Sequence, residues 1–440
     1  MAHRAPKAFP YTLIPHNARD TTVAADHREA YARRFSALGD PLADAVVEMA
    51  RRRPAGEGRA MFEQALAQGI DTIGDPPPEL TAFFRGVEAP PYWADADQLD
   101  LAARVIGRTG PLGLAALSMG ALLGGYLAHR VTKPLVITGD LDRMAARRIA
   151  ETTEWFVQVT RPGALKPFAA GWTATLRVRL MHALVRAGMS RRPDWDWEAW
   201  DHPVNQSQMA GTNALFAVAI LSGSEALGAR FTAREKAAVY HYWRVVGHLM
   251  GVDPEILLTD ERDAARLMSV QAVYEFDAPD LDSQRLARAL LQAIGPLTVG
   301  DDDDLPHRVG RATATAILCA YARQILGSEN ADFLALPDHA LMQRILGGAA
   351  TIIRSAEVLR CVLPGATRLS ETCGRRSWVA AAQRMMRQHN GDSRYRRHDH
   401  LAGQPAPTTS VRHSAIERAQ RTTPVPQSLP RTATSARPSS

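Results

Sequence analysis

The chain has 440 residues, of which 46% are hydrophobic and 22% charged, as in an ordinary globular protein. This length allows a large core or two closely packed subdomains. The formal net charge is +6, but acidic and basic residues are interspersed through the body, and an Arg-rich C-terminal stretch supplies part of the excess. Because no zinc spacing or other recognition module accompanies the charge, we expect no nucleic-acid partner.

The N-terminal residues predict an extended arm before the first helices. Residues 1–35 are polar and contain prolines, and the start of the chain lacks the apolar segment of a secretory signal. We therefore expect a cytoplasmic protein. A helix is predicted to begin after Asp40, which would cap it, with Pro41 at the first position. Proline clusters at 76–78 and 90–91 then interrupt the chain.

Residues 111–128 have a composition close to that of a membrane span. They are apolar, rich in Gly and Ala, and bounded by basic residues. Their length is near the lower limit for crossing a bilayer. We predict a buried core helix here and no transmembrane span, with peripheral membrane contact as the alternative.

The remaining chain predicts one helix after another, and no alternation long enough for a strand. The predicted fold class is therefore all-α. From about residue 395 the chain is rich in Thr, Ser, Pro and Arg, which predicts a disordered tail. The predicted helices lie at about 97–108, 111–128, 140–160, 172–189, 205–227, 232–250, 260–275, 280–294, 308–326, 338–362 and 376–388.

One of these helices, residues 172–189, carries a histidine on an apolar face. His182 has apolar side chains at i−4, i+3 and i+7, so its ring faces a core or a cavity. Two buried ring nitrogens are costly unless both have partners, and a haem iron would take one of them. Arg179 and Arg186, about one turn to either side, could meet haem propionates. The alternative is a satisfied core histidine flanked by solvated arginines.

A histidine pair lies on the predicted helix 232–250. His241 and His248 are seven residues apart, so they share one helix face two turns apart. This separation is too large for one metal ion but suits one side of a large flat ligand, with Tyr242 and Trp243 as apolar neighbours. An ordinary interhelical interface is the alternative.

Other chemical signatures are absent from the sequence. The three cysteines, Cys319, Cys361 and Cys373, are far apart and form neither a disulfide framework nor a zinc set. The chain also lacks the phosphate-binding, dinucleotide-binding, zinc-protease and serine-hydrolase motifs.

Several motifs, taken in order, resemble those of the MpaB / latex-clearing-protein oxygenase family. The resemblance covers about residues 95–295, and the Gly/Ala-rich helix at 111–128 lies in its upstream part. The motifs are Glu151-Thr152, Pro162-Gly163, Arg179-Leu180-Met181-His182-Ala183, Pro203-Val204-Asn205-Gln206, Leu227-Gly228 and Tyr242-Trp243-Arg244 with Gly247-His248 and Gly251.

The resemblance implies a globin-like helical core with additional helices, holding one haem b (iron protoporphyrin IX). In this family the histidine of the R-L-[ML]-H-A helix is the proximal iron ligand, which is His182 here. The other residues expected around the haem are Arg179, Thr212, Phe216 and His248. The resemblance also implies four parts: an N-terminal arm with accessory helices (1–94), the catalytic domain (95–295), a helical extension (296–394) and the tail (395–440).

Characterised members of the family use O2 to cleave carbon–carbon double bonds in isoprenoid chains. The resemblance therefore implies an oxygenase with an apolar alkene substrate, in which Glu151 is the positional match for a proposed base. Rubber-cleaving members can carry a Lys-Thr pair opposite the iron, but here the candidate Lys166 is followed by Pro167, which puts rubber cleavage itself in doubt. The alternatives are a non-catalytic haem-binding sensor or carrier, and a helical interaction protein without cofactor.

Overall fold

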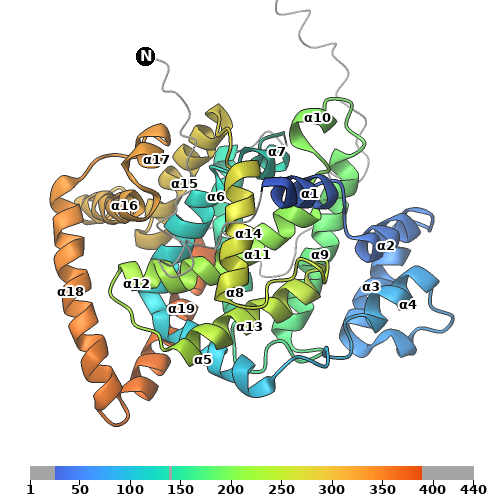
Figure 1. The fold of residues 1–440 in the computed structure, drawn as a ribbon, viewed down its shortest axis with the longest axis horizontal. Helices are drawn as coiled ribbons and strands as arrows, with labels where there is room; N and C mark the ends of the chain where they lie inside the picture. The colour runs from blue at the N-terminus through green and yellow to red at the C-terminus, as the bar shows by residue number, and fades with distance from the viewer. Residues whose placement is uncertain (1–24, 138–140, 389–440) are drawn as a thin grey trace, which may run out of the picture. The chain divides into compact units, whose positions relative to one another are not determined.

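The computed structural model describes residues 25–137 and 141–388, and every regular element in these ranges is helical (Figure 1). The predicted all-α fold class is confirmed. The elements are α1 (Ala25–Phe35), α2 (Pro41–Arg51), α3 (Glu57–Gln68), η3 (Ile70–Thr72), α4 (Pro78–Arg85), α5 (Ala96–Ala115), η4 (Ala116–Leu122), α6 (Leu123–Gly125), α7 (His129–Ile137), α8 (Leu141–Val159), α9 (Ala170–Met189), α10 (Trp197–Trp200), α11 (Gln206–Val218), η5 (Ala219–Gly223), α12 (Ser224–Ala226), α13 (Ala233–Leu249), α14 (Glu261–Tyr274), α15 (Leu281–Val299), α16 (Leu305–Leu326), α17 (Ser328–Phe333), α18 (Ala340–Val362) and α19 (Ala366–Gln388).

The core is organised around α5 and α8. α5 packs against α13 and α19, while α8 packs against α9, α15 and α19. Polar contacts fix these helices at their ends: Tyr242 of α13 donates to the carbonyl of Val159 at the end of α8. Arg375 of α19 donates to the carbonyl of Thr160 at 2.7 Å. The last described helix is therefore tied to the middle of the chain.

The apolar stretch at 111–128 forms the end of α5 after its kink, then η4, α6 and the turn that follows α6. α5 is kinked at Gly110, whose φ of 50° is unfavourable for other residues, directly before Pro111. In the described part of the chain, Ala96–Gly125 is the one helix long and apolar enough to cross a membrane, and 61% of its apolar window is buried inside the protein. This burial agrees with the predicted core helix.

Two π-helical segments meet in the core. η4 follows α5, η5 follows α11, and the two segments pack against each other. Such wide turns are rare within helices and are often found near functional sites. Here they adjoin Gly125 and Leu215, which line a small cavity between α6, α7, α11 and α14.

The extended arm predicted for residues 1–35 is wrong over residues 25–35, which form α1. Ala32 and Phe35 are buried, and the rings of Tyr31 and Phe35 lie 5.0 Å apart. These side chains give an otherwise polar segment one apolar face, which packs on α11 and α14. The rest of the predicted arm, residues 1–24, lies outside the described residues, and so does the predicted tail from residue 395.

Several short helices were not among the predicted elements. α4 begins at Pro78, the last residue of a predicted break, because proline is favoured at the first helical position. α3, α7 and α17 also lie in stretches for which the sequence predicted no helix. The described residues belong to one compact unit, so the boundaries at residues 94 and 295 and the globin-like character of the core stay predictions.

Candidate functional site

The candidate site is built on α9, where Arg179, His182 and Arg186 follow one another about one turn apart. Arg179 is 4% exposed and forms a bidentate ion pair with Asp40, with Nε–Oδ2 and Nη2–Oδ1 distances of 2.6 and 2.9 Å. Arg186 pairs with Asp44 at 2.8 Å and donates to the carbonyl of Val204 at 2.8 Å. The start of α2 therefore supplies a carboxylate on either side of His182.

These pairs change how the two arginines are understood. The sequence suggested that Arg179 and Arg186 meet haem propionates or solvent, but both are buried and neutralised by aspartates about 140 residues earlier in the chain. Their observed contacts clamp α2 against α9. A contact between Arg179 and a cofactor stays a prediction, which the ion pair with Asp40 does not support.

The Pro203-Val204-Asn205-Gln206 motif also helps to hold α2 in place. Asn205 caps α11 in a capping box, and the buried Gln206 donates to the carbonyls of Gly39 and Gly251 at 2.8 and 2.9 Å. Gly251 has φ +80°, and a Cβ there would lie 2.2 Å from Oδ2 of Asp40. The residues that carried the family resemblance therefore join the starts of α2 and α11 to the end of α13.

His182 itself has an unsatisfied ring. Its Nδ1 is buried with no hydrogen-bond partner among the described residues. Burial, with Arg186 as a smaller contribution, lowers the pKa of His182 to about 4, against an opposing effect of Asp40. The imidazole is therefore neutral at physiological pH, which is the form that binds a metal. The alternative from the sequence, a satisfied core histidine, would require a partner for Nδ1 that the described residues do not supply.

An aromatic wall lies between α8, α11 and α13. Phe216 of α11 stacks on Trp243 of α13 with ring centroids 4.8 Å apart, and Trp155 of α8 meets Phe216 edge-on at 5.6 Å. The indole nitrogens of Trp155 and Trp243 are buried without partners in the described chain. One turn before Phe216, Thr212 is exposed on a helix whose other residues are buried or half-buried. The predicted residues Thr212 and Phe216 thus share one open face of α11.

The face of α8 beside this wall is polar. Glu151 is half-buried and pairs with Arg147 on the same helix at 2.8 Å, and the adjacent Thr152 is exposed. Arg148, one turn before Thr152, is half-buried and has no ion pair within the described chain. Its charge lowers the pKa of the buried Tyr126, although burial raises that pKa overall. The sequence alone does not single out Arg148, because an unpaired cation on a helix is recognised only when the partners of its neighbours are known.

The structure does not bring the two predicted catalytic residues, Glu151 and Lys166, into contact with His182. Lys166 is exposed on the turn between α8 and α9, where its backbone N–H donates to the carbonyl of Gly163 at 3.2 Å. No hydrogen bond or ion pair among the described residues links Lys166 or Glu151 to His182.

His241 and His248 face a loop. The backbone N–H of Asp95 donates to Nε2 of His241 at 2.9 Å, and the ring of Trp93 lies edge-on to both histidines at 6.0 Å. The guanidinium of Arg244 lies 4.0 Å above Trp93. These contacts are with the loop before α5 and not with a neighbouring helix, and a cofactor contact for His248 stays a prediction.

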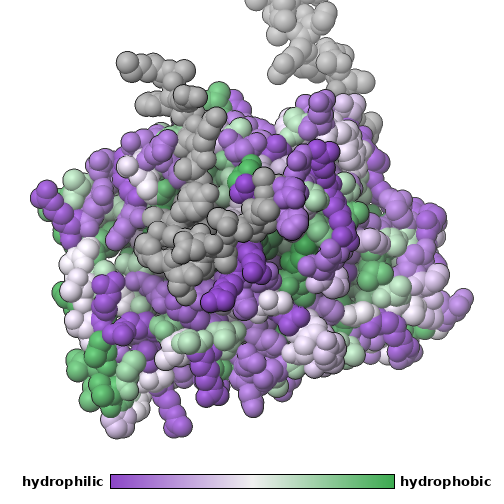
Figure 2. Space-filling view, viewed as in Figure 1, coloured by the Kyte–Doolittle hydropathy of each residue, from purple (hydrophilic) through white to green (hydrophobic). Residues whose placement is uncertain are grey.

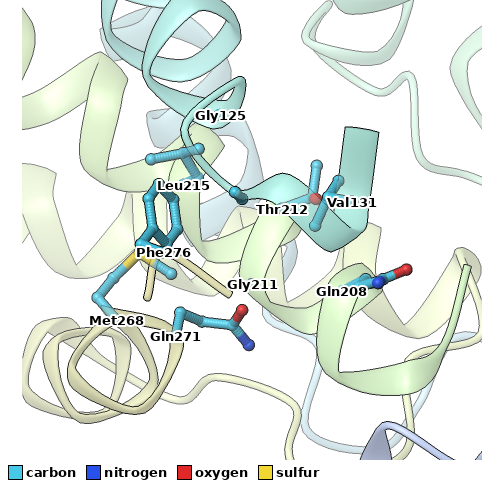
Figure 3. A pocket seen from close by; sticks show the side chains of 10 residues that line it. Gly125, Val131, Gln208, Gly211, Thr212, Leu215, Met268, Gln271 and Phe276 are labelled. Atoms are coloured by element: carbon cyan, nitrogen blue, oxygen red, sulfur yellow. The ribbon is translucent and has the colours of Figure 1, made fainter. Parts of the chain in front are cut away.

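A cavity of about 30 Å³ lies between α6, α7, α11 and α14, large enough for water but not for a porphyrin (Figure 3). Thr212 and Val131 lie on one side of it, and Phe276 and Met268 on the other. Glu275, next to Phe276, is fully buried, and its carboxyl oxygens make no hydrogen bond of good geometry within the described chain, although the nearby Gln208 opposes the rise of its pKa. Burial raises the pKa of Glu275 to about 8. The lining is Gly125, Ala128, Val131, Gln208, Gly211, Thr212, Leu215, Met268, Gln271 and Phe276.

Residues 25–137 and 141–388 contain no group of three or more His, Cys, Asp or Glu side chains placed to hold a metal ion. The three cysteines are free: Cys319 is buried, and Cys361 and Cys373 are exposed. His182 would therefore act as a lone ligand, between the ion pairs of Arg179 with Asp40 and of Arg186 with Asp44.

The fold is an all-helical domain with a buried histidine, His182, on one of its central helices. Residues 104–355 match the family described as "ER-bound oxygenase mpaB/B'/Rubber oxygenase, catalytic domain". The match covers more than half of the chain, which therefore belongs to this family of oxygenases.

Two relatives make the comparison concrete. The rubber oxygenase of Streptomyces sp. (strain K30) is 23% identical over 313 residues, which are 70% of this chain and 72% of that protein. The solved structure of the latex clearing protein LCP in its closed state superposes with a TM-score of 0.56 at 21% identity, covering 78% of this chain and 89% of that one. The second likeness shows that the two share a fold.

Proposed function

We propose that this chain is an oxygenase that holds haem b through His182 and uses O2 to cleave a carbon–carbon double bond of an apolar, isoprenoid-like substrate. The observation that carries the proposal is His182, a neutral imidazole with an orphaned buried nitrogen on a helix beside an aromatic wall. The family supports the oxygenase class. The rubber oxygenase relative supports the alkene substrate.

The residues present fit a haem. A ring nitrogen of His182 would ligate the iron, and the carboxylates of a haem edge could meet Arg148, the unpaired cation of α8. Trp155 and Phe216 would exclude water and hold an apolar substrate. When bound, the haem supplies the binding and activation of O2.

Glu151 is the proposed base. Its carboxylate would leave Arg147 and accept an allylic proton of the substrate at Oε1, which now contacts Nε of Arg147. The proposal does not use Lys166, because its side chain is exposed on the turn after α8.

The cofactor is tested by absorption spectroscopy and a pyridine haemochrome assay on the purified chain. We expect about one haem b per chain, and its loss in His182→Ala, because the residue that would hold the iron is removed. His307→Ala, on the surface of α16, is the matched control and should retain the haem. A colourless wild type that takes up no added haem would overturn the proposal, as would full haem content in His182→Ala.

Turnover is tested by O2 uptake and carbonyl products with a short polyisoprenoid alkene. Glu151→Gln should keep the haem and lose activity by roughly 100-fold or more, the usual contribution of a general base. Glu154→Gln is the control, because Glu154 lies on the same helix and contacts Gln158. A haem-loaded wild type without O2 uptake would favour the sensor or carrier alternative.

A further inference from the structure

α18 is an exposed helix that no part of the described chain covers on its outer face. It has 23 residues, of which Ala350 is the buried one, on the inner side. It forms the left margin of the molecule in Figure 1, beyond α16, and apolar surface gathers at its lower end in Figure 2.

The exposed side of α18 has a regular pattern. Seven exposed positions alternate in spacing by four and three residues, as in one seam of a coiled coil. No charged residue occupies the seam. Its members are Leu341 (72% exposed), Ile345 (52%), Gly348, Ile352 (72%), Ser355, Leu359 (58%) and Val362 (71%).

Two glycines inside the helix are unexplained by the single chain. Gly347 and Gly348 lie mid-helix, and a Cβ on either would meet nothing within 4 Å. Glycine in an exposed helix interior costs about 1 kcal/mol relative to alanine. Small residues at such points allow a second helix backbone to approach closely.

We propose that α18 pairs with α18 of a second copy of this chain, antiparallel about a two-fold axis at Ile352. In this register Ile345 of one copy faces Leu359 of the other, and Gly348 faces the small side chains at 355–356. In this register each chain buries the whole seam. A two-fold axis also means that the same surface is buried on both chains.

Area and charge both agree with this partner. The seam, with Val358 and Leu363 beside it, leaves on the order of 800 Å² of exposed apolar surface per chain, which is what each partner buries in a specific interface. In a parallel pair, Arg344 of one chain would lie beside Arg344 of the other chain. The antiparallel pair keeps these two arginines apart. Residues 389–440 are a poor alternative occupant, because they contain few apolar side chains.

The test is the mass of the full chain in solution by light scattering and sedimentation at micromolar concentration. We expect a dimer, and Ile352→Asp should weaken self-association by roughly 100-fold, because two carboxylates would meet at the axis. Leu305→Asp is the matched control: Leu305 on α16 is also 72% exposed and should leave the dimer intact. Ile352→Cys, with Cys361 and Cys373 changed to Ser, should form a disulfide-linked dimer on oxidation.

The same measurements can overturn the proposal. A monomeric wild type, a dimer that survives Ile352→Asp, or a failure of Ile352→Cys to cross-link would each do so. A chain that becomes dimeric only when shortened to end at Gln388 would show that residues 389–440 occupy the seam. A monomer that binds vesicles containing anionic lipid, and loses binding in Ile352→Asp, would assign the seam to a membrane surface.

Discussion

The buried ion pair between Asp40 and Arg179 sets the position of α9 relative to α2. Asp40→Asn should lower the free energy of unfolding by about 3–5 kcal/mol, because Arg179 would stay buried without a counter-charge. Asparagine is as good an N-cap as aspartate, so the cap of α2 is kept. Urea denaturation measures the change. The control is Asp194→Asn, which removes an exposed pair with Arg192 and should cost less than about 1 kcal/mol. A loss for Asp40→Asn no larger than the control would contradict this account.

Glu275 should make stability depend on pH. Burial raises the pKa of Glu275 from 4.5 to about 8, so the folded state holds its proton more tightly than the unfolded state. Its contribution is therefore greatest below pH 4.5 and is lost progressively as pH rises toward 8.

Glu275→Gln should remove this dependence. It should stabilise the protein by up to roughly 3 kcal/mol at pH 7 and by little at pH 4.5. Thermal unfolding at the two pH values measures the difference, with the exposed Glu329→Gln as control. An equal effect at both pH values would show that Glu275 does not titrate in this range.

At the level of elements, local signals located the long helices. Asp40 with Pro41, and Thr232 with Glu235, cap α2 and α13 as the sequence predicts. α1 and α3 were not predicted, because their apolar faces are short and are recognised only together with the helices on which they pack.

Periodicity placed His182 on α9 with its side chain toward the interior. The partners of Arg179 and Arg186 come from α2, and no local pattern encodes a contact across 140 residues.

Gln206 joins three elements and should be sensitive to substitution. In addition to its two donated bonds, its Oε1 accepts from the backbone N–H of Asp253 at 2.8 Å. Gln206→Leu should cost about 3 kcal/mol, because three backbone groups would lose their partner. The control is Gln343→Leu, which loses one surface contact with Asp338. Chemical denaturation compares the two variants, and equal stability would show that water replaces the amide.

At the level of the whole molecule, the charge is unevenly distributed. Residues 389–440 contain eight arginines against three carboxylates, so they carry most of the net charge of +6. The described part of the chain is close to neutral, so its summed charge does not favour an anionic macromolecule as a partner.

If haem binds the folded chain as proposed, it should raise the free energy of unfolding of the whole molecule. A group that binds the folded state alone adds RT ln(1 + [L]/Kd), about 2.7 kcal/mol at a hundred times Kd. The haem-loaded wild type should therefore unfold several degrees above the haem-free protein, and the shift should grow with haem concentration. Scanning calorimetry at two haem concentrations measures both effects.

The variants separate specific from adventitious binding in that experiment. His182→Ala should lose the shift, because its neutral imidazole is the proposed iron-binding group, while His307→Ala should keep it. Non-specific haem on apolar surface would stabilise all three proteins alike, or destabilise them by binding the unfolded chain. A full shift in His182→Ala would therefore separate haem binding from α9, even if the protein were coloured.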